Sequence, residues 1–146
     1  MDEVNIHVEA AVNPTEDLEK VKNAVKNLFG NMTFETRPAH RGDLLVAESS
    51  GTTGPALFRD LLHRERIRDA ARGVLLKGIK GGSIIFYLNK QVAFAGHISF
   101  SQAVGESPLG PIKVEIRCDN PKDLIEWLSP RTIKSGKRKP VGNRFA

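Results

Sequence analysis

Three arginines stand four residues apart in a segment with helical spacing of apolar residues: Arg64, Arg68 and Arg72. Side chains four residues apart lie on one face of an α-helix, so the three guanidinium groups would form a stripe beside the apolar face. One guanidinium group can donate hydrogen bonds to two oxygens of the same phosphate. The stripe is therefore a candidate contact for nucleic acid or another partner. Glu65 and Asp69 carry the opposite charge nearby, so ion pairs within the helix or with a second subunit are the commoner alternative.

Basic residues also gather at the C-terminal end of the chain. The last sixteen residues hold six of the 22 Lys and Arg residues and none of the 17 Asp and Glu residues, so the other 130 residues carry a net charge of −1 and the positive charge of the chain lies in this segment. Few of its residues are apolar, so we expect a flexible tail at 131–146 after a single domain at 1–130. RNA contact through this tail and simple solvation of its cations are the two interpretations. The candidate contacts are Lys134, Lys137, Arg138 and Lys139.

A loop rich in small hydroxyl residues and glycine runs from Ser49 to Pro55, with the sequence SSGTTGP. It resembles the phosphate-gripping loop of acyl-adenylate-forming enzymes, in which backbone N–H groups bind the phosphates of a nucleotide. That family continues the loop with a proline and a lysine in a much longer chain, whereas Ala56 and Leu57 follow Pro55 here. The alternatives are a nucleotide or phosphate site and a plain link that begins the next helix.

The remaining reactive residue types predict no catalytic, cofactor-binding or metal-binding residues. The four histidines are too scattered for metal-ligand spacing, and the single cysteine, Cys118, falls on the apolar phase of a strand, as a small core residue would. His97 and Ser99 would share the outer face of one strand as a base and a nucleophile. A catalytic pair also needs an orienting acid and an oxyanion donor, so a chance pairing is the alternative.

Length and composition suit one compact domain. The chain has 146 residues, of which 40% are hydrophobic and 27% charged, enough for a buried core. No run approaches the ~20 apolar residues of a membrane span, and the first residues lack the basic and apolar regions of a secretory signal. The single cysteine rules out an internal disulfide, which agrees with a reducing compartment. We therefore expect a cytoplasmic protein without membrane contact.

Apolar alternation predicts strands, and apolar spacing of three and four residues predicts helices. The expected strands lie at residues 4–12, 32–37, 44–49, 83–88, 91–100 and 112–118. The expected helices run from a start signal at 13–17 to Gly30, over 55–77, and from Asn120 to Leu128. The apolar phase slips near 64–66, which predicts two helices or a bend in the middle segment.

The order of these elements, β-α-β-β-α(α)-β-β-β-α, indicates an α+β domain with a mainly antiparallel sheet and helices packed on one face. The other face would stay uncovered and polar, and its mixed charges suit water as well as a subunit or ligand contact. An RNA-binding sheet would expose aromatic residues for base stacking, and the polar strand positions offer at most Tyr87. The expected residues of this face are His7, Glu9, His97, Lys113, Glu115 and Arg117.

Four motifs together resemble an archaeal protein family of unassigned function, number 0201: VNPTED at 12–17, RIRDAAR at 66–72, FYLNKQ at 86–91 and ESPLGPI at 106–112. The likeness spans about residues 4–132. It implies no catalytic residues, because none is established for that family. It implies a fold similar to that of the 5S-RNA-binding protein of the large ribosomal subunit, an α+β layer compatible with the predicted order.

Two functions follow as hypotheses. The favoured one is a non-enzymatic binding or structural protein, a homo-oligomer such as a dimer, that uses the uncovered sheet face or the arginine-rich helix, with RNA as one partner. The alternative is a small enzyme or nucleotide-binding protein that uses the loop from Ser49 to Pro55 together with the loop at 106–111.

Overall fold

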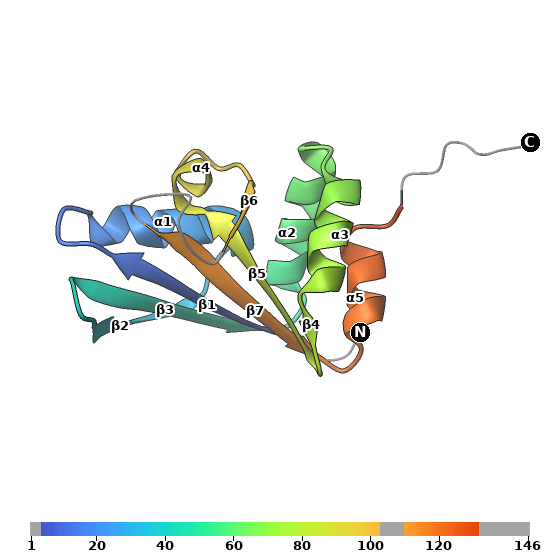
Figure 1. Ribbon diagram of the computed structural model, residues 1–146, viewed down its shortest axis with the longest axis horizontal. Helices are drawn as coiled ribbons and strands as arrows, with labels where there is room; N and C mark the ends of the chain where they lie inside the picture. Colours follow the sequence, from blue (N-terminus) through green and yellow to red (C-terminus); the bar gives the residue numbers. More distant parts are fainter. Residues whose placement is uncertain (1–3, 103–109, 132–146) are drawn as a thin grey trace, which may run out of the picture.

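The described strands form one antiparallel sheet (Figure 1). The computed structural model of the protein describes residues 4–102 and 110–131. Seven strands line up there in the order β2-β3-β1-β7-β5-β4, with β6 beside β5. The first strand lies at the centre, paired with β3 on one side and β7 on the other. The bounds are β1 Val4–Val12, β2 Thr33–Pro38, β3 Asp43–Ser50, β4 Ile79–Lys80, β5 Ser83–Asn89, β6 Phe100–Ser101 and β7 Pro111–Cys118.

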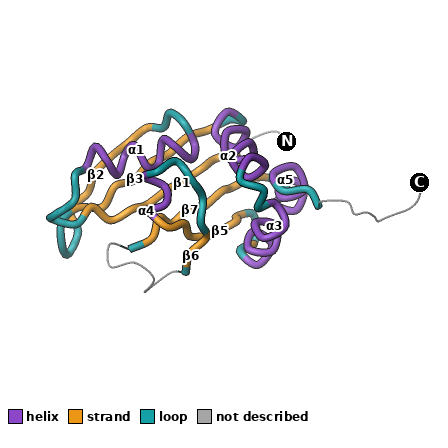
Figure 2. The backbone as a smooth tube through the Cα atoms, turned by 90° about the horizontal axis from the view of Figure 1, so that it is seen from above, coloured by secondary structure: helices purple, strands orange, loops and turns teal. Residues whose placement is uncertain are grey.

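Helices cover one face of this sheet and leave the other face bare. Figure 1 and Figure 2 show α1 and α4 over one half of the sheet, and α2, α3 and α5 side by side at the other end. This arrangement confirms the predicted α+β domain with helices packed on one face. The helices are α1 Leu18–Phe29, α2 Thr53–Arg64, α3 Arg68–Lys77, α4 Lys90–Phe94 and α5 Pro121–Leu128.

Alternation along the strands decides which face is buried. On β1 every second residue from Val4 to Val12 is buried, and the residues between them lie on the bare face. Partners in an antiparallel pair share a face, so Ile6 brings Ile116 of β7 into the core, and Val8 brings Ala47 of β3. The predicted half-buried character of these strands is therefore confirmed.

A stack of three phenylalanine rings joins the helices to the sheet. The ring of Phe58 on α2 lies 5.1 Å from that of Phe29 on α1 and 5.6 Å from that of Phe86 on β5, measured between centroids. All three side chains are buried, and each such burial contributes about 2 to 3 kcal/mol to the free energy of folding. The stack thus ties α2 to α1 and to β5.

The predicted strand at 91–100 is wrong, because a short helix takes its place. The side-chain oxygen of Asn89 accepts a hydrogen bond from the backbone N–H of Val92 at 3.0 Å, which caps the first turn of α4. Only Phe100–Ser101 then pairs with β5. His97 and Ser99 therefore lie beyond the helix and share no outer strand face, which removes the predicted pairing of the two side chains.

The first helix begins later than predicted, and it ends where predicted. The side chain of Asp17 accepts a hydrogen bond from the backbone N–H of Glu19 at 2.9 Å, so the cap lies after the predicted proline. Pro14 instead belongs to a turn, closed by a 2.8 Å hydrogen bond from the N–H of Glu16 to the carbonyl of Asn13. Gly30 ends the helix with a φ of 79°.

The predicted break in the middle segment is confirmed, since α2 ends at Arg64 and α3 begins at Arg68. The last helix is also confirmed: the side chain of Asn120 accepts a hydrogen bond from the N–H of Asp123 at 3.2 Å, and Pro121 occupies the first turn. No helix in the described ranges is long and apolar enough to cross a membrane.

Two predicted features lie outside the described residues: the basic tail with Lys134, Lys137, Arg138 and Lys139, and the loop at 106–111 apart from its last two residues. The fold likeness to the ribosomal 5S-RNA-binding protein stays a prediction.

Candidate functional site

Rows of polar side chains cross the bare face of the sheet, which we call the open face. Strand register places His7 of β1 opposite Glu48 of β3 and opposite Glu115 of β7. The rows on either side of it pair Glu9 with Lys113, and Asn5 with Ser50 and Arg117. The predicted polar face is thereby confirmed, apart from the one histidine that lies beyond α4.

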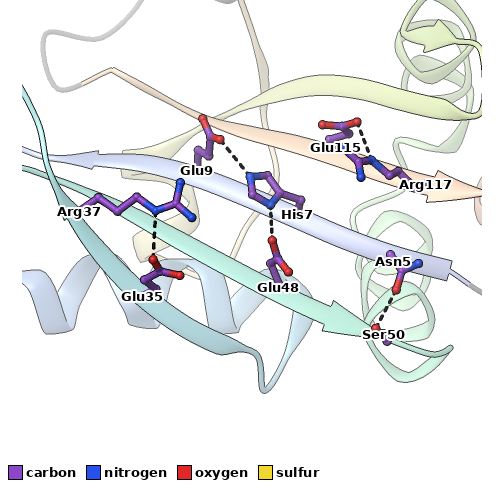
Figure 3. Close-up of polar contacts among 9 residues, drawn as sticks. All are labelled: Asn5, His7, Glu9, Glu35, Arg37, Glu48, Ser50, Glu115 and Arg117. Carbon is purple, nitrogen blue, oxygen red and sulfur yellow. Dashed lines mark hydrogen bonds and ion pairs between the residues drawn. The ribbon is translucent and has the colours of Figure 1, made fainter.

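His7 is held between two carboxylates (Figure 3). Its Nδ1 lies 2.8 Å from Oε2 of Glu48 and its Nε2 lies 2.9 Å from Oε2 of Glu9. Carboxylates only accept hydrogen bonds, so both ring nitrogens can donate at once only when the ring is protonated, and the two contacts favour the imidazolium form. Partial burial lowers the pKa of His7, but the two carboxylates raise it by more, so the pKa lies above its usual value.

Other charged residues of the open face also bind their neighbours. Nε of Arg117 donates to Glu115 at 3.0 Å, and the hydroxyl of Ser83 donates to the same carboxylate at 3.0 Å. The hydrogen bond from Arg117 lowers the pKa of Glu115 against the opposing effect of burial, so the carboxylate stays ionised. Nε of Arg37 donates to Glu35 at 3.1 Å in the same way (Figure 3). Much of the charge on this face is thus neutralised within the sheet.

The hollows that the described residues form on the open face are shallow. One of about 290 Å³ lies over the ends of β1 and β3, between His7, Ser50 and Arg117. Tyr87 is the one aromatic residue on this face of the described strands, and it is half-buried. Stacking of successive bases needs several exposed rings, so the open face lacks the platform of a sheet that reads single-stranded RNA.

The three arginines of the predicted stripe do not share one helix face. Arg64 is the last residue of α2 and Arg68 is the first of α3, with a turn between them. The predicted break near 64–66 and the predicted stripe exclude each other, because a stripe needs one continuous helix. The structure has the break. Arg72 is ion-paired with Glu126 of α5, and its side chain is only 14% exposed. The stripe is therefore corrected to two arginines at a turn and one in an interhelical pair.

Two further contacts use up basic side chains where α2 and α3 meet α5. Nε of Arg59 donates to the carbonyl of Trp127 at 2.8 Å, and the guanidinium lies over the indole ring at 5.2 Å from its centroid. Arg72 also donates to the carbonyl of Ser129 at 3.4 Å. These arginines hold the three helices together, which leaves them less available for a partner.

The α2–α3 turn, residues 64–68, differs from its surroundings because its arginines lack such contacts. Arg64 and Arg66 are exposed and Arg68 is half-exposed, and none of the three forms an ion pair among the described residues. The acid of this turn, Glu65, accepts a hydrogen bond from Nδ1 of His97 at 2.8 Å. That contact lowers the pKa of Glu65 and holds its carboxylate toward the segment after α4.

Positive charge around the turn also affects His63, on the last turn of α2. Burial lowers the pKa of His63 first, and the charges of Arg59 and Arg68 lower it further, so the ring is neutral at pH 7. Its Nε2 is buried without a hydrogen-bond partner in the described part of the chain. A neutral ring is the form that neighbouring guanidinium groups tolerate best.

The loop from Ser49 to Pro55 links β3 to α2. Gly51 has a φ of 100°, which favours glycine, and a Cβ at Gly54 would lie 3.1 Å from Cδ1 of Ile6, so a side chain there would be crowded. Thr52 precedes the helix without a side-chain hydrogen bond to its first turn. This geometry agrees with the interpretation of the loop as a helix-starting link, and it leaves backbone N–H groups of α2 without a cap.

The structure brings together no metal ligands in residues 4–102 and 110–131, where no group of three His, Cys, Asp or Glu side chains converges. Cys118 packs partly against the core, and burial raises the pKa of its thiol. This placement supports the prediction of a small core residue over that of a reactive thiol.

Sequence reasoning missed a buried ion pair. Lys90 is fully buried, and its Nζ donates to Oε1 of Glu16 at 3.0 Å and to the carbonyl of Ala11 at 2.6 Å. The pair ties the start of α4 to the turn before α1. Polar residue types in two segments 74 positions apart gave no signal for it.

The chain is similar in sequence and in fold to archaeal proteins. A family model described as RNA binding matches residues 5–118. A UPF0201 protein of Sulfolobus acidocaldarius is 46% identical over 127 residues, which cover 87% of this chain and 88% of the relative. A UPF0201 protein of Methanopyrus kandleri is 50% identical over 132 residues, which cover 84% and 82%. The crystal structure of a UPF0201 protein from Methanococcus jannaschii has a TM-score of 0.79 at 30% identity, covering 89% of this chain and 96% of that one.

Proposed function

Because this chain belongs to the UPF0201 family of archaeal proteins, we propose that it is a binding protein that contacts the phosphate backbone of RNA through the α2–α3 turn. The observation that carries the proposal is the pair Arg64 and Arg68, whose guanidinium groups have no ion-pair partner in the described ranges. The description of the family model as RNA binding supports it. A binding role is favoured over catalysis because the ionisable side chains of the open face, His7 and Arg117 among them, are bound to neighbouring carboxylates of the sheet.

An unpaired guanidinium at a convex turn can meet a phosphate without first breaking an internal ion pair. It then displaces condensed counterions from the nucleic acid, which makes the affinity fall as salt rises. Arg72 would add less, because it is already bound to Glu126. The tail residues Lys134, Lys137, Arg138 and Lys139 would add sequence-independent attraction from outside the described residues.

Binding of a labelled RNA hairpin, followed by fluorescence anisotropy from about 50 to about 300 mM KCl, tests the proposal. For the double variant Arg64→Gln/Arg68→Gln we expect a dissociation constant about tenfold higher at low salt, and a salt slope smaller by about 1.5. The matched control Arg37→Gln/Arg41→Gln removes the same charge at the far end of the sheet, where both residues are exposed. Equal losses in the two variants, no binding at low salt, or binding that ignores salt would contradict the proposal.

A specific feature of the open face favours a second contact, to another copy of this chain in a dimer. Its acids and bases are balanced, so two copies related by a two-fold axis would not repel each other. Leu44, Ile85 and Tyr87 are half-buried there and offer apolar area to an interface. Sedimentation velocity across a hundredfold range of protein concentration tests this, with Ile85→Glu as the disrupting variant. A monomer at every concentration would contradict it.

The loop from Ser49 to Pro55 supports a nucleotide or phosphate site as the alternative function, because the N-terminus of α2 has no side-chain cap and no acid in its first turn. A thermal-shift screen with nucleotides and inorganic phosphate tests it. A ligand present at 100 times its dissociation constant would stabilise the fold by ~2.7 kcal/mol. A screen without any shift would contradict the alternative.

A further inference from the structure

The end of α2 has the geometry that usually demands glycine. The backbone N–H of Arg66 donates to the carbonyl of His63 at 3.2 Å, and that of Ile67 donates to the carbonyl of Leu62 at 3.2 Å. These two hydrogen bonds define a Schellman motif, in which the residue after the cap adopts the left-handed conformation. That residue is Arg66, with a φ of 60°.

Arg66 is the one residue other than glycine with a positive φ in the described part of the chain. Six glycines occupy the other such positions: Gly30, Gly42, Gly51, Gly81, Gly96 and Gly110. A side chain in this conformation brings Cβ close to the following carbonyl, which destabilises the fold relative to glycine. The chain therefore has a large residue in a conformation for which it uses glycine at every other described position.

Contacts of the Arg66 side chain do not explain this choice. The residue is exposed, and its guanidinium has no hydrogen-bond or ion-pair partner among residues 4–102 and 110–131. The adjacent carboxylate, Glu65, is bound to His97 at 2.8 Å. Backbone strain that no internal contact offsets is typical of residues that serve a binding site.

We infer that Arg66 is a phosphate-binding residue, presented at the tip of the α2–α3 turn between Arg64 and Arg68 to take a backbone phosphate of RNA. This inference rests on the proposed function and extends it to a residue outside the predicted stripe. The left-handed conformation of Arg66 lies between the end of α2 at Arg64 and the start of α3 at Arg68, so the three arginines occupy the corner between two helices instead of one helix face. Such a corner matches a groove edge of structured RNA, where consecutive phosphates are closely spaced.

Substitution of Arg66 by glycine separates stability from binding, because the two should change in opposite directions. For Arg66→Gly we expect the midpoint of thermal unfolding to rise by about 2 to 4 °C, since the strain is removed. We expect the dissociation constant for the RNA hairpin to increase about fivefold, and the salt slope to shrink by about 1. Arg66→Lys keeps the charge without the planar fork, so its loss of affinity should be about twofold.

The control Arg41→Gln removes one exposed charge from the loop between β2 and β3 and should leave RNA affinity within about twofold. If Arg66→Gly binds RNA as the wild type does while Arg64→Gln/Arg68→Gln binds weakly, the inference fails and the proposed function stands. A lower thermal midpoint for Arg66→Gly would show that the side chain supports the fold, which also overturns the inference. If the wild type binds no RNA at low salt, both fail together.

Discussion

The open face and the α2–α3 turn both carry charged residues, but in the part of the chain that the structure describes, charges on the open face form ion pairs with each other and the arginines of the turn do not. On the open face His7 lies between Glu9 and Glu48, and Arg117 binds Glu115. At the turn, Arg64 and Arg66 are exposed and have no ion-pair partner in the described ranges. The difference teaches that the number of charges on a surface says little about its partners, whereas the number left unpaired says much.

Strand register explains this contrast. Adjacent antiparallel strands hold side chains opposite each other about 5 Å apart, so a charge on one strand nearly always has a neighbour within reach. The one acid of the α2–α3 turn, Glu65, is already bound to His97, so Arg64 and Arg66 form no ion pair among the described residues. Charges on the sheet therefore serve the sheet first, and charges on the turn are free for a partner.

The largest expected change in stability comes from the buried ion pair of Lys90 and Glu16, which shows how much more a buried charge pair contributes than an exposed one. Glu16→Gln replaces a carboxylate that the buried ammonium of Lys90 contacts with a neutral amide, so we expect the free energy of unfolding to fall by about 3 kcal/mol. Urea unfolding followed by circular dichroism measures it. Glu19→Gln, which removes an exposed partner of Lys22, should change it by less than about 0.5 kcal/mol. Similar losses in both variants would contradict the distinction between buried and exposed pairs.

A smaller effect tests whether the open face is internally neutralised. The pKa of His7 is raised in the folded state, so its stabilising effect is complete below the unfolded pKa near 6.5 and is lost as the pH rises through the folded value. We expect the wild type to exceed His7→Gln in stability by up to about 1 kcal/mol at pH 6, and by less at pH 8.5. His40→Gln, in the loop between β2 and β3, is the control. A difference that grows with pH would show that the ring is not held as a cation.

The smallest effect is expected where the comparison predicts none. Arg37→Gln/Arg117→Gln removes two ion-paired cations from the open face, whereas Arg64→Gln/Arg68→Gln removes two cations without an ion pair from the described turn. Because the open face pairs charge within itself, its variant should change RNA affinity by less than about twofold in the same anisotropy titration. A loss as large as that of the turn variant would break the comparison and place RNA on the sheet.

The parts of the fold with strong periodicity were predictable from the sequence. Strict alternation in β1 and the capped helix after Asn120 follow from local rules, and both agree with the structure. The segment after Asn89 alternates as well, but one capping hydrogen bond to Val92 turns it into a helix. A short apolar alternation does not produce a strand here, because Asn89 caps a helix and Lys90, in its first turn, forms a buried ion pair with Glu16.

The candidate site was predictable only in residue types. Arg64 and Arg68 were identified by spacing, and the conformation of Arg66 was not, because a left-handed residue outside glycine leaves no mark in the sequence. The partners of His7 were equally hidden, since Glu48 meets it through strand register across 41 positions. Local patterns thus locate charged residues, and long-range packing decides which of them remain unpaired.

The central place of β1 bears on how a new chain reaches this fold. β1 is synthesised before both of its neighbours in the sheet, and one of them, β7, begins only at Pro111. At a synthesis rate of roughly 5 to 20 residues per second, one edge of β1 waits on the order of 5 to 20 s for its partner. The unpaired backbone N–H and C=O groups along that edge would invite pairing with other nascent chains. The rate of translation and any chaperone that covers this edge would therefore affect how much of the new chain reaches the native fold.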